Sequence, residues 1–164
     1  MDVFSQAKRS WIMSRVRASG TRPEVFVRNG LRRAGIRYSS NCSHIPGHPD
    51  FVLRGLRLAV FVNGCFWHWH GCARCRWPKT HRQYWRKKIA SNVLRDRQAR
   101  KQLHAQGWRY ATIWECALAR GLQRLIKTAR SLQTKAADRG LRTRETEARK
   151  ASPRRSSVPR SAAR

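Results

Sequence analysis

The chain has 164 residues, of which 37 are Lys or Arg and 8 are Asp or Glu, so its formal net charge is +29 at pH 7. This length has room for one domain with one core, since domains usually hold about 100–200 residues. Such an excess of positive charge repels itself in a compact protein unless a polyanion neutralises it. We therefore expect a nucleic acid as the partner; a basic surface that is merely solvated is the alternative.

The sequence contains no candidate membrane span and no secretory signal. No run approaches the roughly 20 apolar residues of a membrane span, and the N-terminal MDVFSQAKRSW lacks the apolar core of a signal peptide. We therefore expect a cytoplasmic protein that does not contact a membrane. Its five cysteines, an odd number with two histidines among them, favour a metal site over a disulfide framework.

Three segments differ in composition. Residues 1–20 favour a basic helix, and residues 21–130 carry the apolar periodicity of a folded domain. Residues 131–164 become rich in Arg, Ser, Ala and Pro, as in KASPRRSSVPRSAAR, and this composition cannot bury enough apolar surface to fold. We expect this last segment to be a disordered basic tail.

The pattern within residues 21–130 predicts helix, strands, helix, strand and helix. Thr21, Pro23 and Glu24 mark the start of the first helix, and Gly35 marks its end. Strands are expected at 36–39, 51–53, 58–62 and 108–115; the run LAVFV is typical of a buried central strand. Helices are expected over 80–106 and through about Ala129. The fold class is therefore α/β, with one mixed sheet flanked by helices.

Acidic residues are scarce, and between positions 20 and 120 they occur only at Glu24, Asp50, Asp96 and Glu115. Asp50 stands in PGHPDFVL at the start of a strand, where a carboxylate projects at the end of the sheet. A hard oxygen donor there suits Mg²⁺, which needs few protein ligands. A turn aspartate after proline is the alternative.

Asp96 falls within an apolar helical stripe, because its spacing from Ile89, Val93 and Leu103 places all four on one face. A carboxylate in such a stripe needs a partner. An arginine would make an internal salt bridge. A histidine would instead be oriented so that its second nitrogen accepts a proton from water.

The segment CFWHWHGC alternates His68 and His70 with Trp67 and Trp69. If it is extended, both histidines point to one side, and one can reach a metal while the other reaches a substrate. Cys65, His70 and Cys72, with Cys116 arriving from the next strand, would form a closed Cys₃His site typical of structural Zn²⁺. Cys75 belongs to a CxxC with Cys72 and is an alternative ligand.

Three aromatic residues, Phe66, Trp67 and Trp85, lie near the expected catalytic residues. In a polycation such side chains can wedge between base pairs and unstack them. The alternative is that they belong to the hydrophobic core.

The runs VFVNGCFWHWHGC, PGHPDFV, KKIASNVLRDR and WRYATIWECAL closely resemble the very-short-patch-repair (Vsr) DNA mismatch endonucleases, over residues 5–125. The resemblance implies a fold like that of type II restriction endonucleases. It also implies nicking of one strand 5′ to the T of a T:G mismatch left by deamination of 5-methylcytosine. The enzyme would act as a monomer at the bacterial nucleoid, with mismatch-repair proteins as partners.

Site residues carry over position by position. The resemblance places the Mg²⁺ ligands at Asp50 and the backbone carbonyl of Val62, the catalytic histidine at His68, its supporting carboxylate at Asp96 and a further active-site acid at Glu24. It places the zinc ligands at Cys65, His70, Cys72 and Cys116. It places the DNA-inserting aromatics at Phe66, Trp67 and Trp85, and a DNA-clasping helix at 8–17.

Two departures from the family pattern stand side by side, because Val62 and Asn63 replace Thr and His of well-known members. The strand 58–62 also lacks the Glu-x-Lys of many nucleases, so His68 must take the role of the lysine. Two rival functions are a restriction-type nuclease that cuts unmismatched duplex and a zinc-braced DNA-binding protein without catalysis.

Overall fold

The computed structural model describes residues 5, 7–8, 11, 19–40 and 42–151, without the side chains of 140–151. Most of the predicted basic helix in residues 1–20, and residues 152–164 of the predicted tail, lie outside the described residues. The chain divides into two compact units, 1–129 and 130–164. The sheet and every candidate site residue belong to the first unit.

The described elements are α2 (Arg22–Arg33), β1 (Phe51–Leu53), η1 (Arg54–Leu56), β2 (Leu58–Asn63), α3 (Cys65–His68), α4 (Arg82–Ala105), β3 (Arg109–Trp114), η2 (Glu115–Ala117) and α5 (Leu118–Ala151). The strands form one sheet in the order β1-β2-β3; β1 is antiparallel to β2, and β3 is parallel to it. The protein is therefore a mixed α/β structure, as predicted.

The first helix begins where its capping residues predict. The side chain of Thr21 accepts a hydrogen bond from the backbone N–H of Glu24, and the carboxylate of Glu24 accepts one from the N–H of Gly20 at 2.8 Å. This arrangement resembles a capping box, except that the carboxylate accepts from the N–H of Gly20, one residue before the N-cap, and not from that of Thr21. It holds Glu24 at the N-terminal end of α2, with 8 % of its surface exposed.

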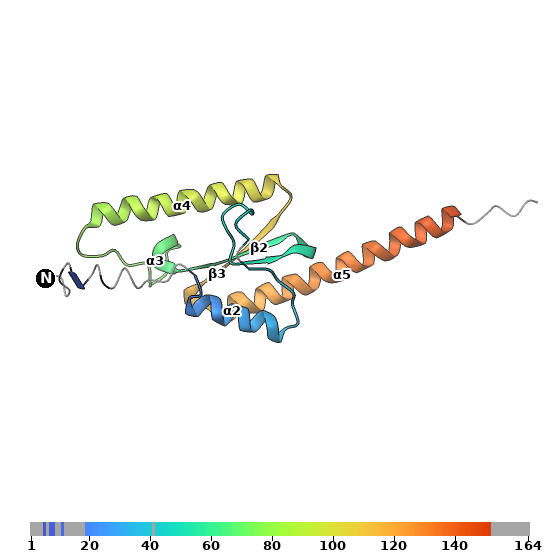
Figure 1. Ribbon diagram of the computed structural model, residues 1–164, viewed down its shortest axis with the longest axis horizontal. Helices are drawn as coiled ribbons and strands as arrows, with labels where there is room; N and C mark the ends of the chain where they lie inside the picture. The colour runs from blue at the N-terminus through green and yellow to red at the C-terminus, as the bar shows by residue number, and fades with distance from the viewer. Residues whose placement is uncertain (1–4, 6, 9–10, 12–18, 41, 152–164) are drawn as a thin grey trace, which may run out of the picture. The chain divides into compact units, whose positions relative to one another are not determined.

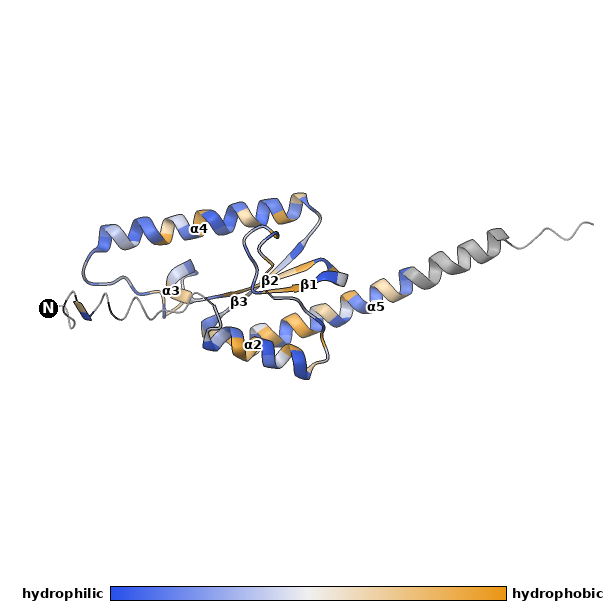
Figure 2. Ribbon diagram, viewed as in Figure 1, coloured by the Kyte–Doolittle hydropathy of each residue, from blue (hydrophilic) through white to orange (hydrophobic). Residues whose placement is uncertain are grey.

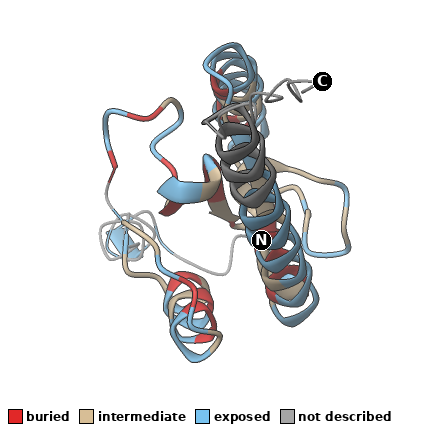
Figure 3. Ribbon diagram, turned by 90° about the vertical axis from the view of Figure 1, so that its right-hand side faces the viewer, coloured by how far each residue is buried: buried red, intermediate tan, exposed pale blue. Residues whose placement is uncertain are grey.

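Helices cover both faces of the sheet (Figure 1). α4 lies on one face, and α2 and residues 118–129 of α5 lie on the other. α2 and α5 pack closely on each other, since a Cβ added at Gly30 of α2 would meet a methyl carbon of Leu122 at 2.1 Å. α5 also packs closely on β3, since a Cβ added at Gly121 would meet Ile113 at 2.8 Å. Apolar colour is concentrated in the strands (Figure 2), and Figure 3 shows how far each residue is buried. The buried residues of α4 are spaced three, seven and four positions apart and so share one side of that helix; they are Ile89, Asn92, Ala99 and Leu103.

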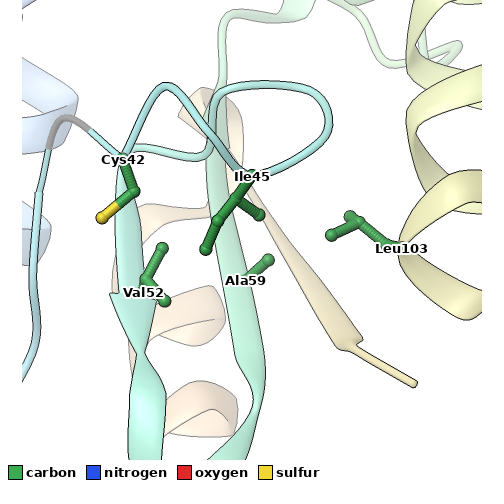
Figure 4. Packing of buried hydrophobic residues seen from close by; sticks show 5 residues of the cluster. All are labelled: Cys42, Ile45, Val52, Ala59 and Leu103. Carbon is green, nitrogen blue, oxygen red and sulfur yellow. The ribbon is translucent and has the colours of Figure 1, made fainter. Parts of the chain in front are cut away.

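A small apolar cluster fixes the loop that precedes β1. The cluster joins Cys42 and Ile45 of this loop to Val52 of β1, Ala59 of β2 and Leu103 of α4 (Figure 4). The side chains of Val52, Ala59 and Leu103 are completely buried. The loop that leads to Asp50 is therefore attached to both the sheet and α4.

Two predicted elements differ in the structure. The predicted strand 36–39 is reduced to an isolated bridge between Ser39 and Val52, because only this pair exchanges backbone hydrogen bonds, at 2.8 and 2.9 Å. The segment around His68 is not extended, since Cys65–His68 forms a short helix that ends at Trp69 with a left-handed φ of 41°.

Two further comparisons concern the predicted helices. The final helix continues to Ala151, beyond the end predicted near Ala129. Among the helices of the described part of the chain, none has both the length and the apolar character needed to cross a membrane.

Candidate active site and metal centre

The sheet brings three predicted residues to one edge. Asp50 directly precedes β1, and Val62 and Asn63 end β2, which runs antiparallel to β1. The backbone N–H of Val62 donates to Oδ2 of Asp50 at 2.6 Å. This bond holds the carboxylate against the end of the central strand.

Burial raises the pKa of Asp50 to about 6, and the hydrogen bond from Val62 opposes this rise. The negative charge of Glu24 raises the pKa further, and His68 lowers it. A carboxylate whose pKa is raised by burial and by a second nearby carboxylate is a candidate functional group. Each carboxylate oxygen of Glu24 accepts one hydrogen bond, from the N–H of Gly20 and from the hydroxyl of Thr21 at 2.7 Å. Glu24 therefore also has a structural role at the start of α2.

His68 and Asp96 are brought together from α3 and α4. Nδ1 of His68 lies 2.6 Å from Oδ2 of Asp96, and both side chains are about one quarter exposed, at 27 % and 24 %. Of the two partners considered for Asp96, the structure thus pairs it with the histidine. A carboxylate on Nδ1 leaves Nε2 free to accept a proton.

One cleft of about 420 Å³ contains all these groups. Its walls come from α2, the loop before β1, β2, α3, α4 and η2. Its carboxylates are those of Glu24, Asp50, Asp96 and Glu115, and its imidazoles are those of His48 and His68. The predicted catalytic residues therefore share a single hollow, which Val62 and Trp67 also line.

The four predicted zinc ligands form a second cluster. The ligand atoms of Cys65, His70, Cys72 and Cys116 all lie within 4.8 Å of one another. Soft sulfur donors with one imidazole match the donor set of structural zinc sites. The cluster could hold a metal ion. The thiol of Cys75 instead donates to the backbone carbonyl of Cys65 at 3.2 Å and stands outside this set of four.

The environments of the thiols differ. Burial raises the pKa of Cys65 to about 12, and hydrogen bonds to neighbouring thiols add to the rise. Burial also opposes ionisation of Cys72, but hydrogen bonds from the backbone of Arg74 and from neighbouring thiols outweigh it and lower the pKa of Cys72. The imidazole of His70 stacks on the Trp114 ring, with 3.9 Å between centroids, which limits its rotation.

The three predicted DNA-inserting aromatics form a third group. Phe66 lies 5.1 Å from Trp67 and 5.2 Å from Trp85 between ring centroids, and all three rings are only partly buried. The three rings therefore do not belong to the buried hydrophobic core. The short helix α3 carries Phe66 and Trp67 beside His68, so the aromatic group adjoins the cleft.

Sequence reasoning did not identify Asn92 and His48. Asn92 is buried on α4, and its amide donates to the backbone carbonyl of Trp67 at 3.1 Å, which holds α3 against α4. Its spacing from Ile89 and Asp96 placed it near the buried stripe and was the available signal. His48 lines the cleft from a turn, and no periodic pattern marks such a position.

The known proteins that this chain resembles are described as DNA mismatch endonucleases or nicking enzymes. The profile of the family described as DNA mismatch endonuclease Vsr matches residues 1–74. The type II nicking enzyme V.XorIIP of Xanthomonas oryzae is 42 % identical over 118 residues, which cover 72 % of this chain and 87 % of the relative. The DNA mismatch endonuclease Vsr of Escherichia coli is 38 % identical over 128 residues, covering 78 % of this chain and 81 % of the relative.

A third relative, the type II nicking enzyme V.NmeAIP of Neisseria meningitidis, is 38 % identical over 117 residues, or 71 % of this chain and 84 % of its own. The matches cover most of each relative. The chain therefore belongs to the family of DNA mismatch endonuclease Vsr.

Proposed function

We propose that the chain is a Mg²⁺-dependent endonuclease that nicks one DNA strand 5′ to the T of a T:G mismatch. Such a mismatch arises when 5-methylcytosine is deaminated, and the nick would initiate very short patch repair. The observation that carries the proposal is the His68–Asp96 pair, which shares one cleft with Asp50 and Glu24. The family, in which relatives are described as nicking enzymes, supports it, as does the charge of +29.

In the proposed mechanism, Asp96 holds His68 in the tautomer that carries its proton on Nδ1. Nε2 then accepts a proton from the attacking water as the water oxygen approaches phosphorus. The contact of 2.6 Å between Nδ1 and Asp96 supports this assignment, because the carboxylate stabilises the imidazolium that forms.

The donors at the strand end fit Mg²⁺. Asp50 and the backbone carbonyl of Val62 would hold the ion with hard oxygen atoms, and the raised pKa of Asp50 reflects a carboxylate that gains from a nearby cation. When bound, Mg²⁺ would stabilise the negative charge that develops on the phosphate. Zn²⁺ in the Cys₃His cluster would have a structural role and would brace α3. We also infer a fold like that of the type II restriction endonucleases.

Nicking of matched and mismatched duplexes tests the proposal. We expect a nicked product on T:G duplexes with Mg²⁺ and little product on the matched duplex. A panel of T:G duplexes with varied flanking bases finds the preferred sequence context.

Asp50→Ala should abolish nicking while DNA affinity stays within a few fold of the wild type. Asp138→Ala, at an exposed acid in the second unit, is the control. Linear product from matched DNA would contradict the proposal in favour of a restriction-type nuclease, and binding without Mg²⁺-dependent cleavage would favour a non-catalytic protein.

Trp67→Ala tests the role of the aromatic group. Insertion costs a few kcal/mol of stacking, and a mismatched pair has less pairing to lose, so insertion favours mismatched DNA. We expect the ratio of T:G to matched nicking rates to fall about tenfold or more. Tyr110→Ala, which removes an exposed aromatic from β3, should leave this ratio unchanged. An unchanged ratio in Trp67→Ala would refute the role.

A further inference from the structure

The cleft around Asp50 has an unusual charge for this protein. The chain has 37 Lys and Arg, yet among the described residues that line this cleft there is none, whereas four are carboxylates. A phosphate entering the cleft meets negative charge and few hydrogen-bond donors. Since Nδ1 of His68 is engaged by Asp96, the remaining imidazole is that of His48.

His48 is held in the cleft by an unusual backbone. It adopts a left-handed φ of 51°, which is uncommon for a residue with a side chain, and it follows Gly47 with a φ of 80°. Its N–H donates to the carbonyl of Ile45 at 3.0 Å, and Pro49 behind it is fully buried. Backbone strain of this kind costs free energy and is concentrated at functional sites.

The neighbours of the turn leave it little freedom. A Cβ at Gly47 would lie 2.7 Å from Cβ of Ala99 on α4 and 3.1 Å from the ring of Phe61 on β2, so the backbone passes closely between these elements. His48 thereby lines three adjoining hollows: the cleft of Asp50, one on the side of α4 and one on the side of α2. Within the described chain, its imidazole makes no hydrogen bond or ion pair.

We infer that the imidazole of His48 donates a hydrogen bond to a non-bridging oxygen of the scissile phosphate and so positions it for attack by water. This inference rests on the proposed function, because it concerns the same cleft. The charged groups that face His48 differ among the three hollows, and the arginines line only the two hollows beside the cleft of Asp50. These groups comprise Glu24 and Arg28 of α2, Asp50, His68 of α3, Arg95, Asp96 and Arg100 of α4, and Glu115 of η2.

The inferred contact predicts opposite effects on stability and on activity. Glycine adopts a left-handed φ without strain, so His48→Gly should unfold at the same temperature as the wild type or higher. Loss of one donor to a reacting phosphate should lower the single-turnover nicking rate by about 10²-fold. His48→Asn, which tolerates the same φ and keeps an N–H donor, should recover part of the rate. His44→Ala, at an exposed histidine of the same loop, should behave like the wild type.

A binding cycle tests the contact without cleavage. Ca²⁺ replaces Mg²⁺, and a T:G duplex is compared with one that carries a neutral methylphosphonate in place of the phosphate 5′ to the mismatched T. His48→Gly should weaken binding of the ordinary duplex severalfold and leave binding of the methylphosphonate duplex unchanged. Equal weakening of both duplexes, or of neither, would overturn the contact.

The two readouts separate the inference from the function on which it rests. Nicking by the wild type without coupling in the binding cycle would reject the role of His48 alone. Coupling without nicking would reject the endonuclease activity and retain the phosphate contact. A nicking rate for His48→Gly within threefold of the wild type would also reject the positioning role.

Discussion

Asp50, the proposed Mg²⁺ ligand, makes the stability of the protein depend on pH. Its carboxylate is partly buried, lies near Glu24, and has a pKa raised to about 6 from 3.8. A raised pKa means that the folded state prefers the protonated carboxyl. The stabilisation is therefore fully present below pH 3.8 and is lost as pH rises through about 6.

Asp50→Asn should remove this dependence in buffer without divalent cations. Asparagine can still accept the hydrogen bond from Val62 but cannot ionise. The variant should be more stable than the wild type by about 2–3 kcal/mol at pH 8, and the difference should vanish below pH 4. Urea unfolding at several pH values measures this, and Mg²⁺ should reduce the difference at pH 8. A difference independent of pH would contradict the prediction.

At the scale of elements, capping residues and hydrophobic patterns predicted the helices and strands whose formation depends on local sequence. The capping residues of α2, the alternation and apolar runs of the strands, and the uninterrupted pattern of α4 each have a direct physical cause, and their bounds were predicted to within two residues. The helix α3 was missed because four residues cannot show a helical period. The approach of His68 to Asp96 was one of two open possibilities, since spacing alone cannot choose between an arginine and a histidine.

Other parts of the site depend on tertiary packing. His48 reaches the cleft through two successive residues with positive φ, at a point where the backbone of Gly47 passes close to Ala99 and Phe61. The grouping of Cys65 and Cys72 with Cys116 requires β3 to run parallel to β2, so that η2 follows at the same edge. Sequence motifs and the family resemblance indicated the three cysteines, but neither His48 nor the distances between the cysteine thiols.

The metal cluster should connect α3 to η2. We expect about one Zn²⁺ per purified chain, and its removal should lower the unfolding temperature, because a structural ion contributes directly to folding. Cys116→Ser should lose Zn²⁺ during dialysis against a mild chelator, since Cys116 is exposed and supplies one of four ligands. Elemental analysis and thermal unfolding measure these effects. Cys75→Ser is the matched control, and its loss of Zn²⁺ instead would assign Cys75 to the site.

At the scale of the whole molecule, the proposed function assigns DNA affinity and cleavage to surfaces of opposite charge. The net charge of +29 resides outside a cleft whose lining has four carboxylates. Positive surface attracts any duplex by releasing counterions, without regard to its sequence. Under the proposed function, selectivity for a mismatch would come from the cleft and the aromatic group.

Raising the salt concentration should lower duplex affinity much more than the nicking rate. If the protein contacts about 6–10 phosphates, raising salt from about 50 to 200 mM should lower duplex affinity by about 10³- to 10⁵-fold. The single-turnover nicking rate at saturating protein should change far less, because in the proposed mechanism the cleft holds a single phosphate. Titration of a labelled T:G duplex at each salt concentration measures both quantities. A nicking rate that falls in parallel with affinity would contradict this division.

The packing of Gly30 against Leu122 has a consequence for synthesis of the protein on the ribosome. α2 emerges early, but its buried face needs α5, whose first turns are translated about ninety residues later. β2 must likewise wait for β3, its parallel neighbour. Because domains form from the segments already translated, the nascent chain holds Glu24, Asp50 and His68 long before it can assemble them. With the proposed active site assembled in this order, the chain would not cut DNA until nearly all of its folded unit has been made.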